Sequence, residues 1–315
     1  MPNCVRKIVF IGHLTTDNIV FNTGKTSFKS PGGATLYCAG GAALYGRGTC
    51  IISAIGTSYN YGRLREAAKQ ANLDIQRIKK LDNHGLDIWI LYDDNNEHYC
   101  IPKYYSGTFE EIVPTCDMIT EDLLQGDHIF HITPMPIKVQ SSIARYLISN
   151  NCIVTLDPPL LSPNDEGFQE WIEILPNLHA FFPSEIEFKA LGGGCSPHKN
   201  PNAIIEFAEH YGVNVLALKL AENGSYLYKK ATKELYYAPT ACRRIIDCTG
   251  AGDAFAGGFI HGYTSINDPI EALGYASVAA SFAAESHSAI ELLYKNKSQA
   301  QQRLYEFSGK VKRLM

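Results

Sequence analysis

Short apolar runs that alternate with helical patterns are the feature of this sequence that most restricts its fold. The runs, each short enough for one buried strand, occupy residues 7–12, 49–55, 128–132, 152–156, 180–182 and 213–219. Apolar residues recur at helical spacing in segments between them, including residues 61–71, 139–149 and 201–211. Strands that alternate with helices favour crossover connections, so we expect an α/β fold with a mostly parallel sheet and helices on both faces.

Two segments depart from this alternation. Residues 17–30 and 87–103 have the pattern of β-hairpins, and the polar run at 93–96 would form the turn of the second. Hairpins of this kind often make a flap that covers a ligand at one edge of a sheet. From residue 252 onward the pattern is helical, and no linker, repeat or low-complexity stretch divides the chain. We therefore expect one domain over residues 1–315, with the two hairpins as a small lid.

Composition narrows the classes of function. A chain of 315 residues with 45% hydrophobic residues can bury one large core, and its formal net charge of −4 leaves no basic excess for a phosphate backbone. The apolar runs are far shorter than the roughly 20 residues that cross a bilayer, and residues 1–7 lack the features of a signal peptide. Nine widely spaced cysteines, none in a Cys-x-x-Cys pair, indicate neither a disulfide framework nor a zinc site. We expect a cytoplasmic protein with no nucleic-acid or membrane partner.

The stretch from 245 to 259 carries the clearest chemistry. Apolar residues lead into a Gly-Ala-Gly turn, and a helical pattern begins at once. The amides of Gly250, Ala251 and Gly252 can then converge on one point at the positive end of a helix, which is a favourable place for a phosphate. Asp253 falls in the first helical turn, where a carboxylate can serve as a base for a hydroxyl nucleophile. The simpler alternative is that Asp253 only caps the helix.

Residues 247–259 resemble the C-terminal signature of the PfkB/ribokinase family of carbohydrate kinases. The resemblance implies a ribokinase-like three-layer α/β/α sandwich with a β-hairpin lid. It also implies that Asp253 is the catalytic base and that the amides of Gly250 to Gly252 stabilise charge on the transferring phosphoryl group. Thr249, in the same stretch, is assigned to the nucleotide site.

The N-terminal part agrees with this resemblance. Asp17 follows the first predicted strand and resembles the carboxylate with which the family binds hydroxyls of the acceptor. Residues 31–46 look like the family's first signature, in which Gly32 and Gly33 would let the acceptor approach the backbone. Tyr37 replaces the Asn that contacts the sugar in ribokinase-like members. This form looks more like the inositol-kinase-like branch, and it assigns Tyr37 to the acceptor site.

Three further segments resemble family motifs with substitutions. Ser184 and Glu187 stand in a Pro-Asn-x-x-Glu-like segment, with Ser184 in place of Asn, and Glu187 would help to hold Mg²⁺ through water. Lys219 and Gly224 belong to a turn near the nucleotide, where Lys219 replaces Thr and could donate to a phosphate. Ser277 replaces Asn on the helix that packs beside the adenine. Ser184, Lys219, Gly224 and Ser277 are therefore candidate nucleotide-binding residues.

The sequence predicts an ATP-dependent kinase that uses Mg²⁺ and phosphorylates a hydroxyl of a small polyol, either a sugar or a cyclitol such as inositol. Two alternatives stay open: a nucleoside kinase of the same family, and a non-catalytic ligand sensor on the same fold. An intact Asp253 with its glycines argues against the sensor. A requirement for a monovalent cation such as K⁺, and the choice between monomer and homodimer, are also left open.

Overall fold

The computed structural model describes residues 7–315 except 47, 95–97 and 195. Its centre is a ten-stranded sheet in the order β14-β13-β12-β11-β10-β9-β8-β1-β4-β5. The parallel strands are β1 (Ile8–Ile11), β4 (Thr49–Ile55), β5 (Leu73–Lys80), β8 (Ile129–Ile132), β9 (Ile153–Leu156), β10 (Ala180–Phe181) and β11 (Val215–Lys219). The antiparallel strands are β12 (Ser225–Lys229), β13 (Glu234–Ala238) and β14 (Lys312–Arg313). The predicted mostly parallel sheet is confirmed.

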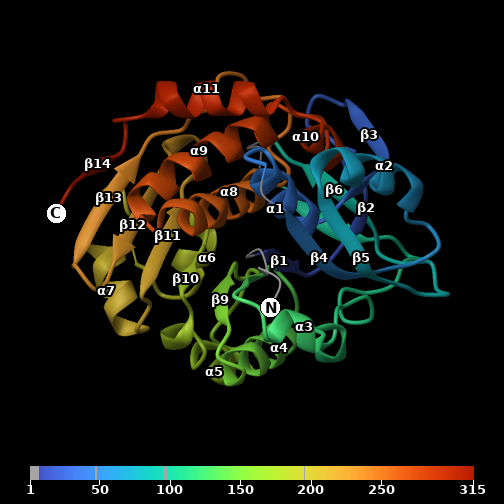
Figure 1. The fold of residues 1–315 in the computed structure, drawn as a ribbon, viewed down its shortest axis with the longest axis horizontal. Coiled ribbons are helices and arrows are strands. Elements are labelled where there is room, and N and C mark those ends of the chain that lie inside the picture. The colour runs from blue at the N-terminus through green and yellow to red at the C-terminus, as the bar shows by residue number, and fades with distance from the viewer. Residues whose placement is uncertain (1–6, 47, 95–97, 195) are drawn as a thin grey trace.

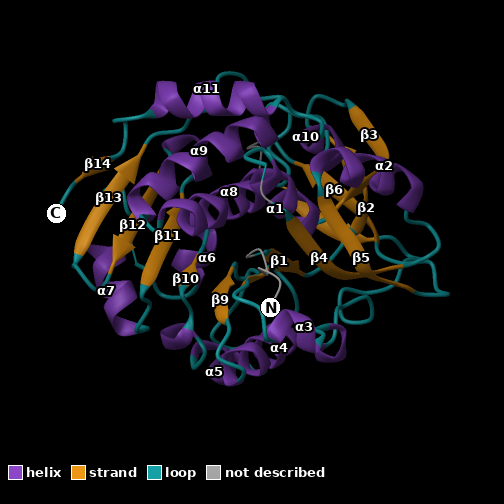
Figure 2. Cartoon of the chain, in the orientation of Figure 1, coloured by secondary structure: helices purple, strands orange, loops and turns teal. Residues whose placement is uncertain are grey.

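Helices cover both faces of this sheet (Figures 1 and 2). One face carries α1 (Ala34–Ala43), α2 (Tyr61–Ala71), α8 (Ala251–Ile266), α9 (Pro269–Ala284), α10 (Ala289–Leu293) and α11 (Lys297–Phe307). The other carries α3 (Glu121–Leu124), α4 (Ile137–Ser149), α5 (Phe168–Ile172), α6 (Glu185–Ala190) and α7 (Asn202–His210). Alternate side chains of β1 enter the two cores, Ile8 and Phe10 on one side and Val9 and Ile11 on the other. This is the expected three-layer arrangement.

A separate four-stranded sheet, in the order β3-β2-β6-β7, forms the lid. Its strands are β2 (Thr15–Val20), β3 (Thr26–Gly32), β6 (Asp87–Tyr92) and β7 (His98–Pro102). Both predicted hairpins are present, and β2 and β6 join them through parallel pairing. The first hairpin extends two residues further at each end than the range 17–30, and part of the turn predicted at 93–96 lies outside the described residues.

The packing of α1 on α8 fixes where α8 begins. A Cβ atom at Gly41 would lie 2.2 Å from the carbonyl oxygen of Ala254, and one at Gly257 would lie 1.9 Å from that of Cys38. The two helices therefore touch backbone to backbone, which only glycine allows. No helix in the described part of the chain is long and apolar enough to cross a bilayer.

Candidate active site

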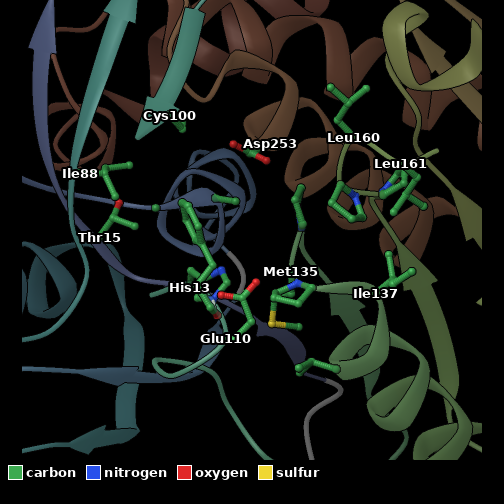
Figure 3. Close-up of a pocket in the computed structure, with 18 of the residues that line it drawn as sticks. His13, Thr15, Ile88, Cys100, Glu110, Met135, Ile137, Leu160, Leu161 and Asp253 are labelled. Atoms are coloured by element: carbon green, nitrogen blue, oxygen red, sulfur yellow. Dashed lines mark hydrogen bonds between the residues drawn. The ribbon is translucent and has the colours of Figure 1, made fainter. Parts of the chain in front are cut away.

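A cavity of about 1190 Å³ opens at the carboxyl ends of β1, β8 and β9, where ligands bind in open α/β sheets. Figure 3 shows Thr15 and Ile88 of the lid on one side, Ile137, Leu160 and Leu161 on the opposite side, and Asp253 at one end. Most of its lining side chains are apolar, and they come from the lid and from the loops after β8 and β9. Among the predicted residues it is lined by Asp17, Gly33, Tyr37, Glu187, Thr249, Gly250 and Asp253.

Asp253 lies in the first turn of α8, as predicted. Gly250 is the residue before this helix and has a left-handed backbone with φ 71°. The Gly252 amide follows in the first turn and has no partner within the helix, so it is available to an anion. The Ala251 amide donates to the Cys248 carbonyl over 3.1 Å and would have to exchange this bond to reach an anion. Burial raises the pKa of Asp253 to about 6, although the nearby Lys219 acts to lower it. A carboxyl group in that range is well suited to accept a proton near neutral pH.

Tyr37 packs directly on the turn before α8. A Cβ atom at Gly250 would lie 2.1 Å from the Cγ atom of the Tyr37 ring. Tyr37 is buried with 3% of its surface exposed, but it still lines the cavity. Tyr37 therefore packs against the turn at Gly250 and forms part of the cavity wall.

Lys219 lies next to the turn at the start of α8. Its Nζ atom is 2.6 Å from Oδ2 of Asp157, a residue that is fully buried after β9. A Cβ atom at Gly252 would be 3.5 Å from that Nζ atom, so the ammonium group is next to the predicted anion hole. Burial acts to lower the pKa of Lys219, but Asp157 and the nearby Glu187 and Asp253 outweigh it and raise the pKa. The site thus contains a fixed positive charge.

Asp17 is the second carboxyl group that faces the cavity. It is buried, and Thr15 Oγ1 donates to its Oδ1 atom over 2.5 Å. Burial raises the pKa of Asp17 to about 7, and the nearby Asp247 and Asp253 add to this effect. Asp17 can therefore accept a hydrogen bond from a hydroxyl group of a ligand.

In the structure, glycine is needed at positions 32 and 33 for a reason other than the expected approach of the acceptor to the backbone. A Cβ atom at Gly32 would lie 1.8 Å from Oδ2 of Asp17, and one at Gly33 would lie 2.5 Å from the carbonyl oxygen of His13. The space beside both α-carbons is filled by the protein's own atoms rather than left for a ligand. Gly32 therefore makes room for the Asp17 carboxylate, while Gly33 still lines the cavity.

Ser184 and Glu187 form a capping box at the start of α6. The Ser184 hydroxyl accepts from the Glu187 amide, and the Ser184 amide donates to Glu187 Oε2 over 2.6 Å. The Glu187 side chain also lines the cavity, whereas Ser184 does not.

Gly224 and Ser277 lie outside the cavity wall. Gly224 follows β11 with φ 84°, and a Cβ atom there would lie 2.2 Å from the carbonyl oxygen of Ala238. Ser277 is buried in α9, and its hydroxyl donates to the Leu273 carbonyl over 3.0 Å. The structure therefore gives each of them a packing or hydrogen-bonding role within the chain.

Several residues at the site were not predicted. His13 lines the cavity with its Nε2 atom 2.9 Å from the carbonyl oxygen of Phe109, and burial lowers its pKa. Asp157 directly follows a predicted strand, and a polar residue at that position was the signal that could have revealed it. Tyr92, at the end of β6, contacts the loop before Gly250, and no local pattern marks it.

Comparison with known proteins identifies the family. The family model described as pfkB family carbohydrate kinase matches residues 5–296. The cytidine kinase of Thermococcus kodakarensis is 27% identical over 258 residues, which are 82% of this chain and 88% of that protein. The nucleoside kinase of Methanocaldococcus jannaschii is 25% identical over 300 residues, 91% of this chain and 93% of that protein.

Solved structures support the same fold. A putative ribokinase II from E. coli in complex with ATP and Mg²⁺ has a TM-score of 0.73 and 19% sequence identity, and the match covers 96% of this chain and 100% of that one. The aminoimidazole riboside kinase of Salmonella enterica, complexed with aminoimidazole riboside and an ATP analogue, has a TM-score of 0.74 and 19% identity. That match covers 94% of this chain and 99% of that one. With the family model across nearly its whole length, the chain belongs to the pfkB family of carbohydrate kinases and is a phosphotransferase.

Proposed function

We propose that this chain transfers the γ-phosphoryl group of ATP to a hydroxyl of a nucleoside-like acceptor. The observation that carries the proposal is the composition of the cavity. Most of its lining residues are apolar, and of its six carboxyl groups, those of Asp17, Glu110, Asp165, Glu166, Glu187 and Asp253, we assign Asp17 and Asp253 to the acceptor. At about 1190 Å³ it is larger than a monosaccharide needs. A free polyol would leave much of the apolar wall in contact with water, whereas an acceptor that joins a sugar to an apolar or aromatic group would cover it.

The roles of the chain's own residues follow from their positions. Asp17 would accept hydrogen bonds from hydroxyl groups of the sugar, and Asp253 would take the proton of the attacking hydroxyl as it bonds to the γ-phosphorus. The amides of Gly250, Ala251 and Gly252 would stabilise the negative charge of the transferring group. Tyr37 and Gly33 would complete the acceptor site, on whose wall both lie.

For the nucleotide we propose Thr249, Lys219, Ser184, Gly224 and Ser277, all of which stand in motifs that resemble those of the family. Thr249 and Lys219 have the strongest support, because one lines the cavity and the other lies next to Gly252. The ammonium group of Lys219 would stabilise phosphate oxygens at the start of α8.

The metal proposals rest on donor chemistry. The described residues contain no group of three or more His, Cys, Asp or Glu side chains that could hold a metal. This fits Mg²⁺, which proteins bind through one or two carboxylates, with phosphate oxygens and water as the other ligands. Glu187 would supply the carboxylate, and the ion would add positive charge at the phosphates. For K⁺ the candidate ligand is Asp247, whose Oδ2 atom is buried without a hydrogen-bond partner in the described part of the chain.

A sugar or cyclitol such as inositol is the second candidate acceptor, and the polar end of the cavity at Thr15 and Asp17 favours it. We also propose that residues 1–315 act as one kinase domain in the cytoplasm. Whether it works as a monomer or a homodimer stays open.

The test is ADP release with Mg·ATP in the presence of cytidine, other nucleosides, ribose, fructose and myo-inositol. We expect nucleosides to give the highest kcat/KM. Turnover of myo-inositol or fructose alone would contradict the nucleoside proposal while leaving the kinase intact. Nucleotide binding without turnover of any acceptor would favour a ligand sensor.

A further inference from the structure

The end of lid strand β6 is hydrogen-bonded to the loop that precedes the predicted anion hole. The Tyr92 hydroxyl is 2.7 Å from Oγ1 of Thr249 and donates to Oδ1 of Asp247 over 3.1 Å. The Thr249 amide donates to the same Oδ1 atom over 2.9 Å. These contacts join residues that are 155 and 157 positions apart in the sequence, immediately before Gly250.

The same strand also forms part of the acceptor side of the cavity. Ile88 and Ile90 line the cavity, and Tyr92 continues their alternation, so all three side chains lie on one face of β6. The Tyr92 ring stacks on Phe21, which follows β2, with ring centroids 5.4 Å apart and planes at 19°. The neighbouring strand β2 carries Asp17, which pairs in register with Ile88. The hydroxyl of Tyr92 is therefore held by the same lid sheet that carries the acceptor carboxylate.

The loop at the other end of this contact is equally constrained. Asp247 is 3% exposed, and its amide donates to the Ala284 carbonyl of α9 over 3.1 Å. Thr249 is buried and lines the cavity beside Gly250. A shift of the lid that broke the Tyr92 contacts would thus take the partner of the buried Thr249 hydroxyl away and leave Oδ1 of Asp247 with the Thr249 amide alone, which is unfavourable.

We propose that Tyr92 is a positioning residue that couples the lid to the phosphate loop, so that a nucleotide at the loop and an acceptor under the lid each stabilise the site for the other. This inference rests on the proposed kinase function, because it assumes that nucleotide binds at the start of α8. Coupling of this kind is reciprocal: whatever the acceptor does to nucleotide affinity, the nucleotide does to acceptor affinity.

The test uses the whole chain with Mg·ADP as probe and hydrogen exchange of the β6 and β7 amides as readout. In the wild-type protein Mg·ADP should slow exchange in these strands by about three- to tenfold, the range that one hydrogen bond supplies. Tyr92→Phe keeps the stacked ring and removes the hydroxyl. It should reduce this protection to below about twofold while Mg·ADP still binds with a Kd within about threefold of the wild-type value.

Two further variants separate coupling from a loss of structure. Thr249→Val removes the other partner of the 2.7 Å contact but keeps the bond from Tyr92 to Asp247. The double variant should therefore lose no more lid protection than Tyr92→Phe alone, because Tyr92→Phe already breaks both bonds. Tyr104→Phe changes an exposed tyrosine just after β7 and should behave as wild type. In activity assays Tyr92→Phe should lower kcat and leave the KM for ATP nearly unchanged.

Equal lid protection in the wild type and in Tyr92→Phe would overturn the inference and leave the kinase proposal standing. If Mg·ADP binds the wild-type protein but does not slow exchange in β6 and β7, the inference is also overturned and the kinase proposal still stands. If Mg·ADP does not bind the wild-type protein, the proposed function itself fails, and this inference fails with it.

Discussion

Asp253 and Lys219 show how the charge of the site is set by neighbours from distant parts of the chain. Burial raises the pKa of Asp253, whereas Lys219, at the end of β11, acts to lower it. Lys219 is itself held by Asp157 at the end of β9, over 2.6 Å. The carboxyl group of Asp157, the ammonium group of Lys219 and the start of α8 thus lie close together, although no two of them are adjacent in the sequence.

Removing the charge of Lys219 should therefore affect the reaction directly. Lys219→Met should lower kcat at pH 7 by about 10- to 100-fold, because a hydrogen bond between charged groups contributes about 1.5–3 kcal/mol. It should also raise the KM for ATP. Lys219→Arg, which keeps the charge, should restore part of the activity. A kcat and a KM within threefold of the wild-type values in Lys219→Met would contradict this role.

The pH dependence of the reaction should report the two carboxyl groups. The pKa of Asp253 is about 6 and that of Asp17 is about 7, both raised by burial. A base works only when it is deprotonated, so kcat/KM should fall as the pH drops below about 7 and should be largely lost below 6. Because the two carboxyl groups interact, the acid side of the pH profile gives apparent pKa values that belong to the pair. A flat profile between pH 5 and 8 would argue against Asp253 as base.

Gly32 offers a test of the Asp17 assignment that leaves Asp17 itself in place. Gly32→Ala would put a methyl group 1.8 Å from the present position of Oδ2 and so displace the carboxylate. A shift of about 1 Å can cost about 100-fold in rate, and we expect a loss of that order in kcat/KM for the acceptor with Mg·ADP affinity unchanged. Gly62→Ala in α2 is the control, since its Cβ atom would meet nothing closer than 3.7 Å. Loss of nucleotide binding in Gly32→Ala would contradict the assignment.

For single residues, the sequence predicted those that stand together in one contiguous motif or directly after a predicted strand. Asp253 and the Gly-Ala-Gly turn were found because they stand together, and Asp17 because it follows the first strand. Asp157 was missed because its partner Lys219 is 62 residues away, and Tyr92 because its partners are more than 150 residues away. The need for glycine at positions 32 and 33 beside Asp17 and His13 was missed because the atoms that fill the space there come from β2 and the loop before it.

Among the elements, the pair α1 and α8 decides where the reactive turn lies. Their contact through Gly41 and Gly257 brings Tyr37 of α1 against Gly250 at the start of α8. The Gly-rich composition of both segments could be read from the sequence, but the contact itself could not, because the helices are more than 200 residues apart. The alternation of strands and helices was predictable because each apolar run is buried on both faces.

Enlarging this contact should destabilise the fold. Gly257→Ala would place a methyl group 1.9 Å from the Cys38 carbonyl oxygen, and overpacking of this kind costs about 1–3 kcal/mol. We expect a lower Tm by thermal unfolding. Gly274→Ala in α9 is the matched control, because its Cβ atom would make only ordinary contacts with Leu304 and Phe307 at 3.6 and 3.7 Å. An unchanged Tm for Gly257→Ala would contradict the close backbone contact.

Other elements were not predicted, for reasons that lie in their environment. β5 contains charged residues and alternates between buried and exposed positions beside only one partner strand, so its sequence lacks the continuous apolar run of the central strands. β12 and β13 form an antiparallel extension of the sheet, in which Tyr226, Tyr228 and Tyr236 are buried against the two cores. Such strands are specified by the neighbours on which they pack more than by their own pattern.

In the whole molecule, the site lies where the two sheets meet. The ten-stranded sheet supplies Lys219 and positions the loop that carries Asp157 and the helix α6 that carries Glu187, while the lid supplies Asp17, Ile88 and Tyr92. In the proposed function this arrangement would enclose the acceptor between the sheets and keep water, the competing nucleophile, away from the phosphoryl group. The cavity's apolar wall arises only from the assembly of these loops, so the sequence analysis, which favoured a small polyol, could not take this wall into account.

The most direct test of the account is transfer of a γ-labelled phosphoryl group from Mg·ATP to cytidine by the wild-type protein and by Asp253→Asn. The account predicts labelled cytidine phosphate with the wild type. It predicts a rate about 100- to 10,000-fold lower with Asp253→Asn, which should still bind Mg·ADP, because a positioned general base contributes that much. Transfer at the same rate by Asp253→Asn, or bound nucleotide with no labelled product from cytidine or any other acceptor in the panel, would contradict it.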